Sequence, residues 1–180
     1  MANRLKEKYD KEIKDKLRAD LKIENVMATP KLVKVVINVG AGEAAQNKNV
    51  LDKIQEQIGW ISGQKPVVTK ARKSVSAFKI RKDLPIGVKV TLRGESMYVF
   101  IDKLVSIVMP RIRDFRGISE STVDQSGNMN IGFTEQTIFP EIEFDKIDKI
   151  RGLQVTLVTN AGNREGGRKL FEMIGIPFKK

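Results

Sequence analysis

The side chains with the clearest chemistry lie between residues 63 and 94, in the segment GQKPVVTKARKSVSAFKIRKDLPIGVKVTLRG. This segment holds nine lysines and arginines and one carboxylate, Asp83, so it supplies +8 of the chain's net charge of +11. Cations this close together repel one another unless an anion neutralises them. Hydroxyl and amide side chains, which can hydrogen-bond bases and 2′-hydroxyl groups, lie among them. The segment therefore predicts a surface that binds a polyanion, and RNA fits this mixture of side chains best.

Individual residues of the segment suit different contacts. Arg72, Lys73, Arg81 and Lys82 have the charge and the reach to bind phosphate groups. Phe78 has two interpretations, because its ring could stack on a base or a ribose, or could anchor the segment to the hydrophobic core. The sequence leaves both open. A membrane surface is a weaker interpretation of the charge, since no apolar helical face accompanies it.

Catalysis is disfavoured by what the chain lacks. The sequence contains no histidine and no cysteine, which excludes Ser-His and Cys-His nucleophile pairs, disulfide bonds and thiolate metal sites. The N-terminal segment is charged throughout, and no uncharged run approaches the length of a membrane span. We therefore expect a protein that is not an enzyme, has no metal or other cofactor and no membrane partner, and works in the cytoplasm.

Residues 40–45, with the sequence GAGEAA, form the one pattern that could indicate an enzyme. They fit the dinucleotide-binding pattern G-x-G-x-x-G/A and lie between a predicted strand and a predicted helix. However, the strand after that helix ends in Thr69 and Lys70, where an acidic residue should hold the ribose hydroxyl, and no second βαβ half follows. A tight turn from strand to helix is the favoured interpretation, and a small nucleotide-binding enzyme is the alternative.

An acidic cluster lies at Glu141, Glu143, Asp145 and Asp148. Paired carboxylates could serve metal binding or acid–base chemistry. Lysines are interleaved with them, and no glycine-rich calcium loop is adjacent. We therefore expect the solvated start of a helix here, with contact to a basic protein partner as the alternative.

The elements that must position these residues follow from hydrophobic periodicity. Apolar residues recur every four positions from Leu5 to Leu21, which predicts a helix over residues 4–22 with a narrow apolar stripe. Alternation between apolar and polar residues over 86–92 predicts a strand with one exposed face, which could receive RNA. The other predicted elements are a strand that ends at Gly40, a helix over 43–61, a short strand over 67–70, a core helix over 97–109, a loop over 117–130, short strands over 129–133 and 136–139, a strand over 153–159 and a terminal helix.

Length and composition indicate how these elements combine. With 180 residues, 41% of them hydrophobic, the chain can fill one core but is too short for two independent domains. We expect a single domain over residues 1–180 of the α+β class. Its sheet should be mostly antiparallel, with helices packed on one face and a protruding basic loop over residues 71–85.

Long, irregular motifs in the sequence are similar to those of a known family. They are VVINVGAGEA from Val35, GQKPVVTKARKSVSAFKIRK at 63–82, LPIGVKVTLRG at 84–94, MPRIRDFRG at 109–117, IGFTEQTIFPEI at 131–142 and the terminal IGIPFKK. On these motifs, and over essentially its whole length, the chain resembles the bacterial large-subunit ribosomal protein number five, the universal L5 family.

The resemblance implies a structural constituent of the large ribosomal subunit that binds 5S rRNA in the central protuberance. It implies an α+β domain whose sheet surface holds 5S rRNA, and a protruding basic loop that reaches the peptidyl-site tRNA. The other implied partners are large-subunit rRNA, other 5S rRNA-binding ribosomal proteins and a small-subunit head protein, which would face the loops around residues 110–145.

The resemblance also implies roles for particular residues. Asn38, Gln64, Phe78 and Thr91 would bind rRNA, and we assign the nearby cations Lys65 and Arg93 to the same interface. The tRNA-binding residues would be Lys70, Arg72, Lys73, Lys79, Arg81 and Lys82, in the loop to which the charge count also points.

Overall fold

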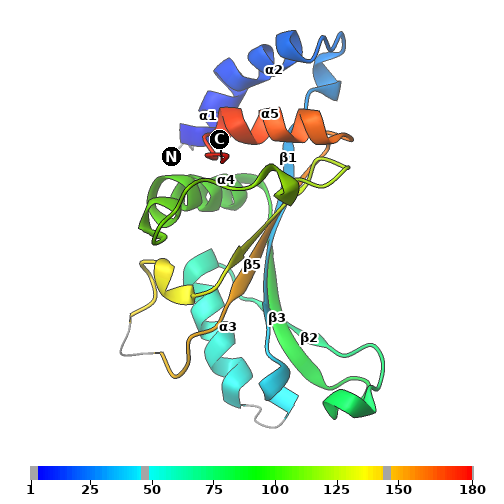
Figure 1. Ribbon diagram of the computed structural model, residues 1–180, viewed down its shortest axis with the longest axis vertical. Coiled ribbons are helices and arrows are strands. Elements are labelled where there is room, and N and C mark those ends of the chain that lie inside the picture. The colour runs from blue at the N-terminus through cyan, green and yellow to red at the C-terminus, as the bar shows by residue number, and fades with distance from the viewer. Residues whose placement is uncertain (1–3, 46–48, 144–146, 180) are drawn as a thin grey trace. The chain divides into compact units, whose positions relative to one another are not determined.

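The computed structural model describes residues 4–45, 49–143 and 147–179, and this part of the chain has an α+β fold (Figure 1). Its strands form one five-stranded antiparallel sheet with the order β2-β3-β1-β5-β4. The predicted fold class is thus confirmed. The strands are β1 (Leu32–Gly40), β2 (Val67–Lys70), β3 (Pro85–Leu92), β4 (Met129–Phe133) and β5 (Leu153–Thr159).

Five α-helices are described, and α1 and α4 each continue directly into a π-helical turn. No helix within the described residues is long and apolar enough to cross a membrane. The α-helices are α1 (Arg4–Lys8), α2 (Lys14–Asp20), α3 (Asn49–Ser62), α4 (Gly94–Lys103) and α5 (Arg164–Ile174). The π-helical turns are Tyr9–Ile13 and Leu104–Val108, and short 3₁₀ helices include Gly42–Ala45, Ser76–Phe78 and Gln136–Ile138.

Two compact units make up the chain, and each is assembled from separate segments. The first unit comprises residues 1–35, 93–131 and 156–180, and the second comprises residues 36–92 and 132–155. Strands β1, β4 and β5 therefore contribute residues to both units. The single domain expected over the whole chain stays a prediction.

In the second unit, α3 covers one face of the strands (Figure 1). The buried side chains of α3 recur at helical spacing, whereas those of β3 alternate with more exposed positions. This difference in period lets a helix and a strand each turn one apolar side toward a shared core. The buried residues include Leu51, Ile54, Ile58 and Ile61 of α3 and Val88, Val90 and Leu92 of β3.

In the first unit, the N-terminal helix packs by the predicted stripe, since Leu5, Tyr9, Ile13 and Leu17 are all buried. The Tyr9 hydroxyl donates a hydrogen bond of 2.8 Å to the backbone carbonyl of Pro30. Burial raises the pKa of Tyr9 to about 12, so this hydroxyl stays protonated as a donor. The predicted terminal helix is α5, which buries Leu170, Phe171 and Ile174.

Two of the predictions made for the segment around the acidic cluster, a strand and the start of a helix, are wrong. The expected strand over 136–139 is the 3₁₀ helix Gln136–Ile138, because the Gln136 side chain turns inward and bonds to backbone groups of Lys149 and Arg151. The helix expected to start at the acidic cluster does not form within the described residues 141–143 and 147–150. Asp145 lies outside the described residues.

The helix predicted over residues 43–61 begins later than expected. Residues 42–45 form a 3₁₀ helix, and α3 runs from Asn49 to Ser62. Leu51, Ile54, Ile58 and Ile61 of α3 are buried in the core, because the 3.6-residue period is kept from Leu51 onward.

Candidate nucleic-acid interface

In the second unit, the sheet face opposite α3 is polar and carries two of the predicted RNA contacts. Asn38 of β1 is exposed, and Thr91 of the neighbouring β3 is half-buried. Lys89 lies on the same face as Thr91, because side chains alternate along a strand. We call Asn38, Thr69, Lys89 and Thr91 the open face. Their amide, hydroxyl and ammonium groups can bond bases, riboses and phosphates.

Gly87 allows β1, β2 and β3 to approach closely on this face. A Cβ atom at Gly87 would lie 2.8 Å from the carbonyl oxygen of Val39 and 2.9 Å from Oγ1 of Thr69, closer than such atoms come in proteins. Thr69 pairs with Gly87, and Val67 with Lys89, in the antiparallel register of β2 and β3. The missing side chain at Gly87 therefore leaves room for the Thr69 hydroxyl beside β3 and near the end of β1.

The segment between β2 and β3 is held by its own backbone. The N–H of Ala71 donates to the carbonyl of Leu84 at 2.8 Å, and Val75 and Ile80 form an antiparallel bridge. Residues 70–82, which we call the basic tip, extend the hairpin past β2 and β3 and away from α3 (Figure 1). The sequence predicted a loop over residues 71–85, and the structure has turns, one isolated bridge and the short 3₁₀ helix Ser76–Phe78 between β2 and β3.

The basic tip carries six exposed cations that no described residue neutralises. In the described part of the chain, none of their side chains forms an ion pair. A group of like charges without counter-charges is the electrostatic footprint of a polyanion site. The six residues are Lys70, Arg72, Lys73, Lys79, Arg81 and Lys82.

Phe78 projects from the basic tip, and 72% of the residue is exposed. The alternative that its ring anchors the segment to the core is therefore wrong. Lys79, which follows it, has a left-handed backbone with φ 54° and ends the 3₁₀ helix. Val75 of the basic tip is a second exposed apolar residue, with 41% of it accessible to solvent. An exposed aromatic ring among cations is suited to stacking on a base while the cations hold the phosphates.

The remaining predicted RNA contacts lie outside the open face and the basic tip. Gln64 and Lys65 are exposed in the turn between α3 and β2, where the Ser62 hydroxyl donates to the carbonyl of Gln64 at 3.0 Å. Arg93 is exposed directly after β3 and belongs to the first unit, where it is the N-cap residue of α4. The structure thus brings Asn38 and Thr91 onto one face and places the turn of Gln64 and Lys65 at the start of the hairpin.

Sequence reasoning missed that the polar face continues onto β5, the other neighbour of β1. Gln154 is exposed between the buried Leu153 and Val155. The alternation of apolar and polar residues in LQVTLVT is the signal that could have identified it. The count of lysines and arginines does not identify Gln154, because its side chain is uncharged.

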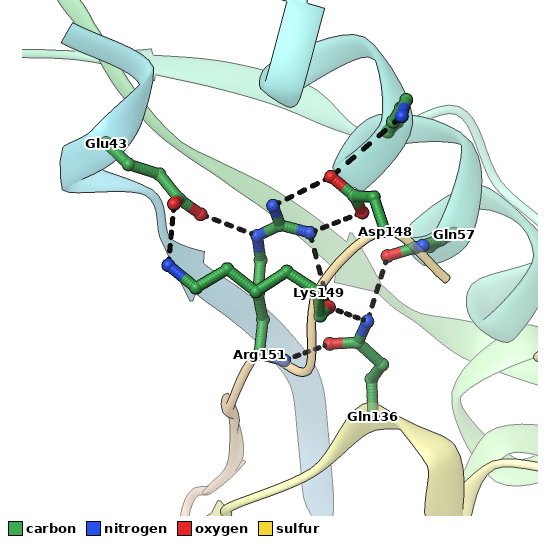
Figure 2. A network of polar contacts seen from close by, with 7 residues as sticks. Glu43, Gln57, Gln136, Asp148, Lys149 and Arg151 are labelled. Atoms are coloured by element: carbon green, nitrogen blue, oxygen red, sulfur yellow. Dashed lines mark hydrogen bonds and ion pairs between the residues drawn. The ribbon is translucent and has the colours of Figure 1, made fainter. Parts of the chain in front are cut away.

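A second polar cluster of this unit surrounds the buried Arg151 (Figure 2). Its Nε donates to Glu43 at 2.8 Å, and its two terminal nitrogens donate to the two oxygens of Asp148 at 2.8 and 3.0 Å. The ammonium of Lys149 binds the other oxygen of Glu43 at 2.8 Å. Oε1 of Gln136 accepts from the backbone N–H of Arg151 at 2.6 Å. The carboxylates of Glu43 and Asp148 satisfy the hydrogen-bonding groups of the Arg151 guanidinium. Arg151 thereby links the segment of Glu43 to the segment of Asp148.

These contacts shift the pKa values of both carboxylates. Hydrogen bonds from Lys149 and Arg151 lower the pKa of Glu43, and the hydrogen bonds from Arg151 lower the pKa of Asp148 to about 2. The same pairing, mainly with Asp148, raises the pKa of Arg151. Asp148 is therefore an ion-pair partner and not a proton donor. Among the described residues, no three acidic side chains come together in a way that could hold a metal ion.

The nucleotide-binding interpretation of residues 40–45 is wrong. Strand β2 pairs antiparallel with β3 at the edge of the sheet, and β3 lies between β2 and β1, so β1 and β2 are not the adjacent parallel strands of a dinucleotide-binding βαβ unit. The carboxylate of Glu43 is held by Arg151 and Lys149. The turn leads from β1 into a 3₁₀ helix, and its residues serve the fold.

Comparison with known proteins agrees with this geometry. Residues 25–81 match the family model described as "Ribosomal protein L5", and residues 85–178 match that of the "ribosomal L5P family C-terminus". The chain is 52% identical over 179 residues to the protein named "Large ribosomal subunit protein uL5" of Chloroflexus aggregans, and 99% of each chain is covered. It is 51% identical, with the same coverage, to the proteins of that name from two strains of Chloroflexus aurantiacus.

Proposed function

The chain belongs to the ribosomal protein L5 family, and we propose that it binds 5S rRNA through the open face and its neighbouring turns. The family consists of structural ribosomal proteins, not enzymes, and the chain is a component of the large ribosomal subunit in the cytoplasm. The proposed rRNA contacts are Asn38, Gln64, Lys65, Phe78, Thr91 and Arg93.

The observation that carries the proposal is the set of six exposed cations on the basic tip, which lack counter-charges among the described residues. RNA phosphates would supply those charges, and the counterions released from the RNA would add to the affinity. The cations would then position the RNA, while Asn38, Gln64 and Thr91 would recognise bases and riboses through hydrogen bonds.

The basic tip is also the proposed contact with the peptidyl-site tRNA. It suits that role because its cations and the exposed Phe78 lie at the far end of a hairpin whose base carries the open face. The proposed neighbours in the assembly are large-subunit rRNA, other 5S rRNA-binding proteins and a small-subunit head protein facing the loops around residues 110–145.

A filter-binding titration of the purified protein tests the proposal. The protein is titrated with 5S rRNA and with an unrelated RNA of equal length, across a series of salt concentrations. We expect a preference for 5S rRNA that persists at high salt, because specific hydrogen bonds and stacking are less sensitive to salt than phosphate contacts. Equal affinities that fall together with salt would refute recognition of 5S rRNA.

The tRNA contact needs a separate test. A photoreactive group attached at position 79, after a Lys79→Cys substitution, should crosslink to tRNA in ribosomes whose peptidyl site is filled. The same group at position 169 of α5, introduced by Lys169→Cys, is the control and should not crosslink to tRNA. Crosslinks to tRNA from both positions, or from neither, would contradict the proposed contact of the basic tip.

A further inference from the structure

The outer face of α3 carries a stripe that the RNA interface does not use. Asp52, Glu56 and Trp60 recur every four residues, and all three are exposed. Side chains at this spacing lie above one another on the same side of a helix. The opposite side of α3 is buried against the core of the second unit. We call these three residues the α3 stripe.

Two features of the stripe are unusual for this chain. Trp60 is the only tryptophan in the sequence, and it is 44% exposed although it is the largest apolar side chain available for the core. The other two residues of the stripe are acidic in a chain with a net charge of +11. Among the described residues, neither Asp52 nor Glu56 takes part in an ion pair.

The nearest cation on the helix does not cancel this charge. Lys53 follows Asp52, but its ammonium group lies 4.0 Å from Asp148, in the cluster around Arg151. The stripe is therefore opposite in sign to the basic tip. Two carboxylates repel an RNA backbone, so a phosphate-bearing partner does not fit here.

The chemistry of the stripe fits arginine. A guanidinium group stacks on an indole ring through its flat face and donates to carboxylates from its edge. Trp60 lies eight positions after Asp52, so the helix rises about 12 Å between them, in two steps of about 6 Å. Every second residue of an extended chain advances about 6.6 Å. An extended peptide with an arginine at every second position could thus place one arginine at each residue of the stripe.

We propose that the α3 stripe binds an extended, arginine-rich segment of a neighbouring protein. Trp60 stacks with one guanidinium at one end of the stripe, and Glu56 and Asp52 pair with the next two cations along the peptide. None of the residues proposed to contact RNA belongs to α3, so this inference does not rest on the 5S rRNA proposal and can fail or succeed independently of it.

The single tryptophan makes a direct test possible, because all indole emission of the protein comes from the stripe. The probe is a synthetic peptide of alternating arginine and serine, titrated into the full-length protein while Trp60 emission is followed. We expect a saturable change in emission. A peptide with citrulline in place of arginine, which keeps the shape but loses the charge, should bind at least about tenfold more weakly.

Substitutions separate the stripe from general electrostatics. Asp52→Asn with Glu56→Gln should weaken the arginine peptide at least about tenfold. The matched control is Glu95→Gln with Glu172→Gln, which removes the same charge from exposed positions on α4 and α5 and should leave the affinity unchanged. Trp60→Ala, followed by anisotropy of a labelled peptide, should weaken binding at least about tenfold, and circular dichroism verifies that the variant is folded.

Three results would overturn the proposal. The first is equal peptide affinity for the unaltered protein and the Asp52→Asn/Glu56→Gln variant. The second is an equal loss in the Glu95→Gln/Glu172→Gln control, which would mean that net charge alone attracts the peptide. The third is a change in Trp60 emission with an RNA oligonucleotide at lower concentration than with the peptide, which would assign this face to RNA.

Discussion

Asp148 has its low pKa because the guanidinium of Arg151 bonds both of its oxygens, and Arg151 is itself buried. Replacing Asp148 with asparagine leaves that guanidinium with weaker partners, so we expect the free energy of unfolding at pH 7 to fall by about 1 kcal/mol. A carboxylate whose pKa is lower in the folded state stabilises the fold above its unfolded pKa of 3.8, and this stabilisation is lost as the pH falls toward about 2. Urea unfolding at several pH values should show the gap between the two proteins closing over that range.

Asp52→Asn is the matched control for this measurement, because Asp52 is exposed and takes part in none of the described ion pairs. Its unfolding free energy at pH 7 should stay within about 0.5 kcal/mol of the unaltered protein. An Asp148→Asn variant as stable as this control would show that Arg151 is held sufficiently by Glu43.

Phe78 allows a second test at a single residue. With 72% of the residue exposed, Phe78→Ala should leave the unfolding free energy within about 0.5 kcal/mol of the unaltered value. Loss of a stacked base should weaken 5S rRNA binding by about 1 to 3 kcal/mol. Met27→Ala, at a position 73% exposed in the first unit, is the control for loss of an exposed apolar side chain. Equal losses of RNA affinity in both variants would argue against stacking.

Among the elements, the three strands of the open face depend on one glycine. Gly87→Ala would force its Cβ against the carbonyl of Val39 and the hydroxyl of Thr69, so we expect a loss of about 1 to 3 kcal/mol in unfolding free energy. Gly132→Ala in β4 is the control, because a Cβ there meets nothing within 4 Å. Thermal unfolding of both variants is the measurement, and equal stability would contradict the close approach of the strands at Gly87.

Local patterns predicted the strands better than the irregular elements. The bounds of β2 and β5 agree with the prediction, and β1 ends at the predicted Gly40, because each strand is an apolar run that turn residues delimit. The segment at Gln136 has the same apolar character, but its side chain bonds to groups 13 and 15 residues away, at Lys149 and Arg151. A local sequence pattern cannot predict contacts between residues that far apart in the chain.

The candidate site was predictable to the extent that it depends on charge and alternation. Nine cations against one carboxylate mark the hairpin, and the period of two places Lys89 and Thr91 on its exposed face. The exposure of Phe78 could not be read from the sequence, since an aromatic residue is as common in a core. The pairing of Glu43 with Arg151 joins residues 108 positions apart, so it becomes visible only in the fold.

At the scale of the whole molecule, a net charge of +11 attracts any RNA, and the distribution of that charge must decide where the RNA binds. Replacing Lys73, Arg81 and Lys82 with alanine removes three cations of the basic tip. If each contacts a phosphate, the slope of log affinity against log salt concentration should fall by up to about three. Gln64→Ala and Thr91→Val should instead lower the affinity for 5S rRNA by about 1 to 3 kcal/mol at every salt concentration and leave the slope unchanged.

The control must remove the same charge from another part of the molecule. Lys6, Lys8 and Lys16 are exposed on the N-terminal helix, where acidic residues are interleaved with them. Their triple alanine variant has the same net charge as the basic-tip variant, so the two proteins attract RNA equally at long range. If the tip makes the phosphate contacts, the N-terminal variant should keep the slope of the unaltered protein. Equal losses of slope would mean that net charge governs binding, and that the hairpin has no special role in it.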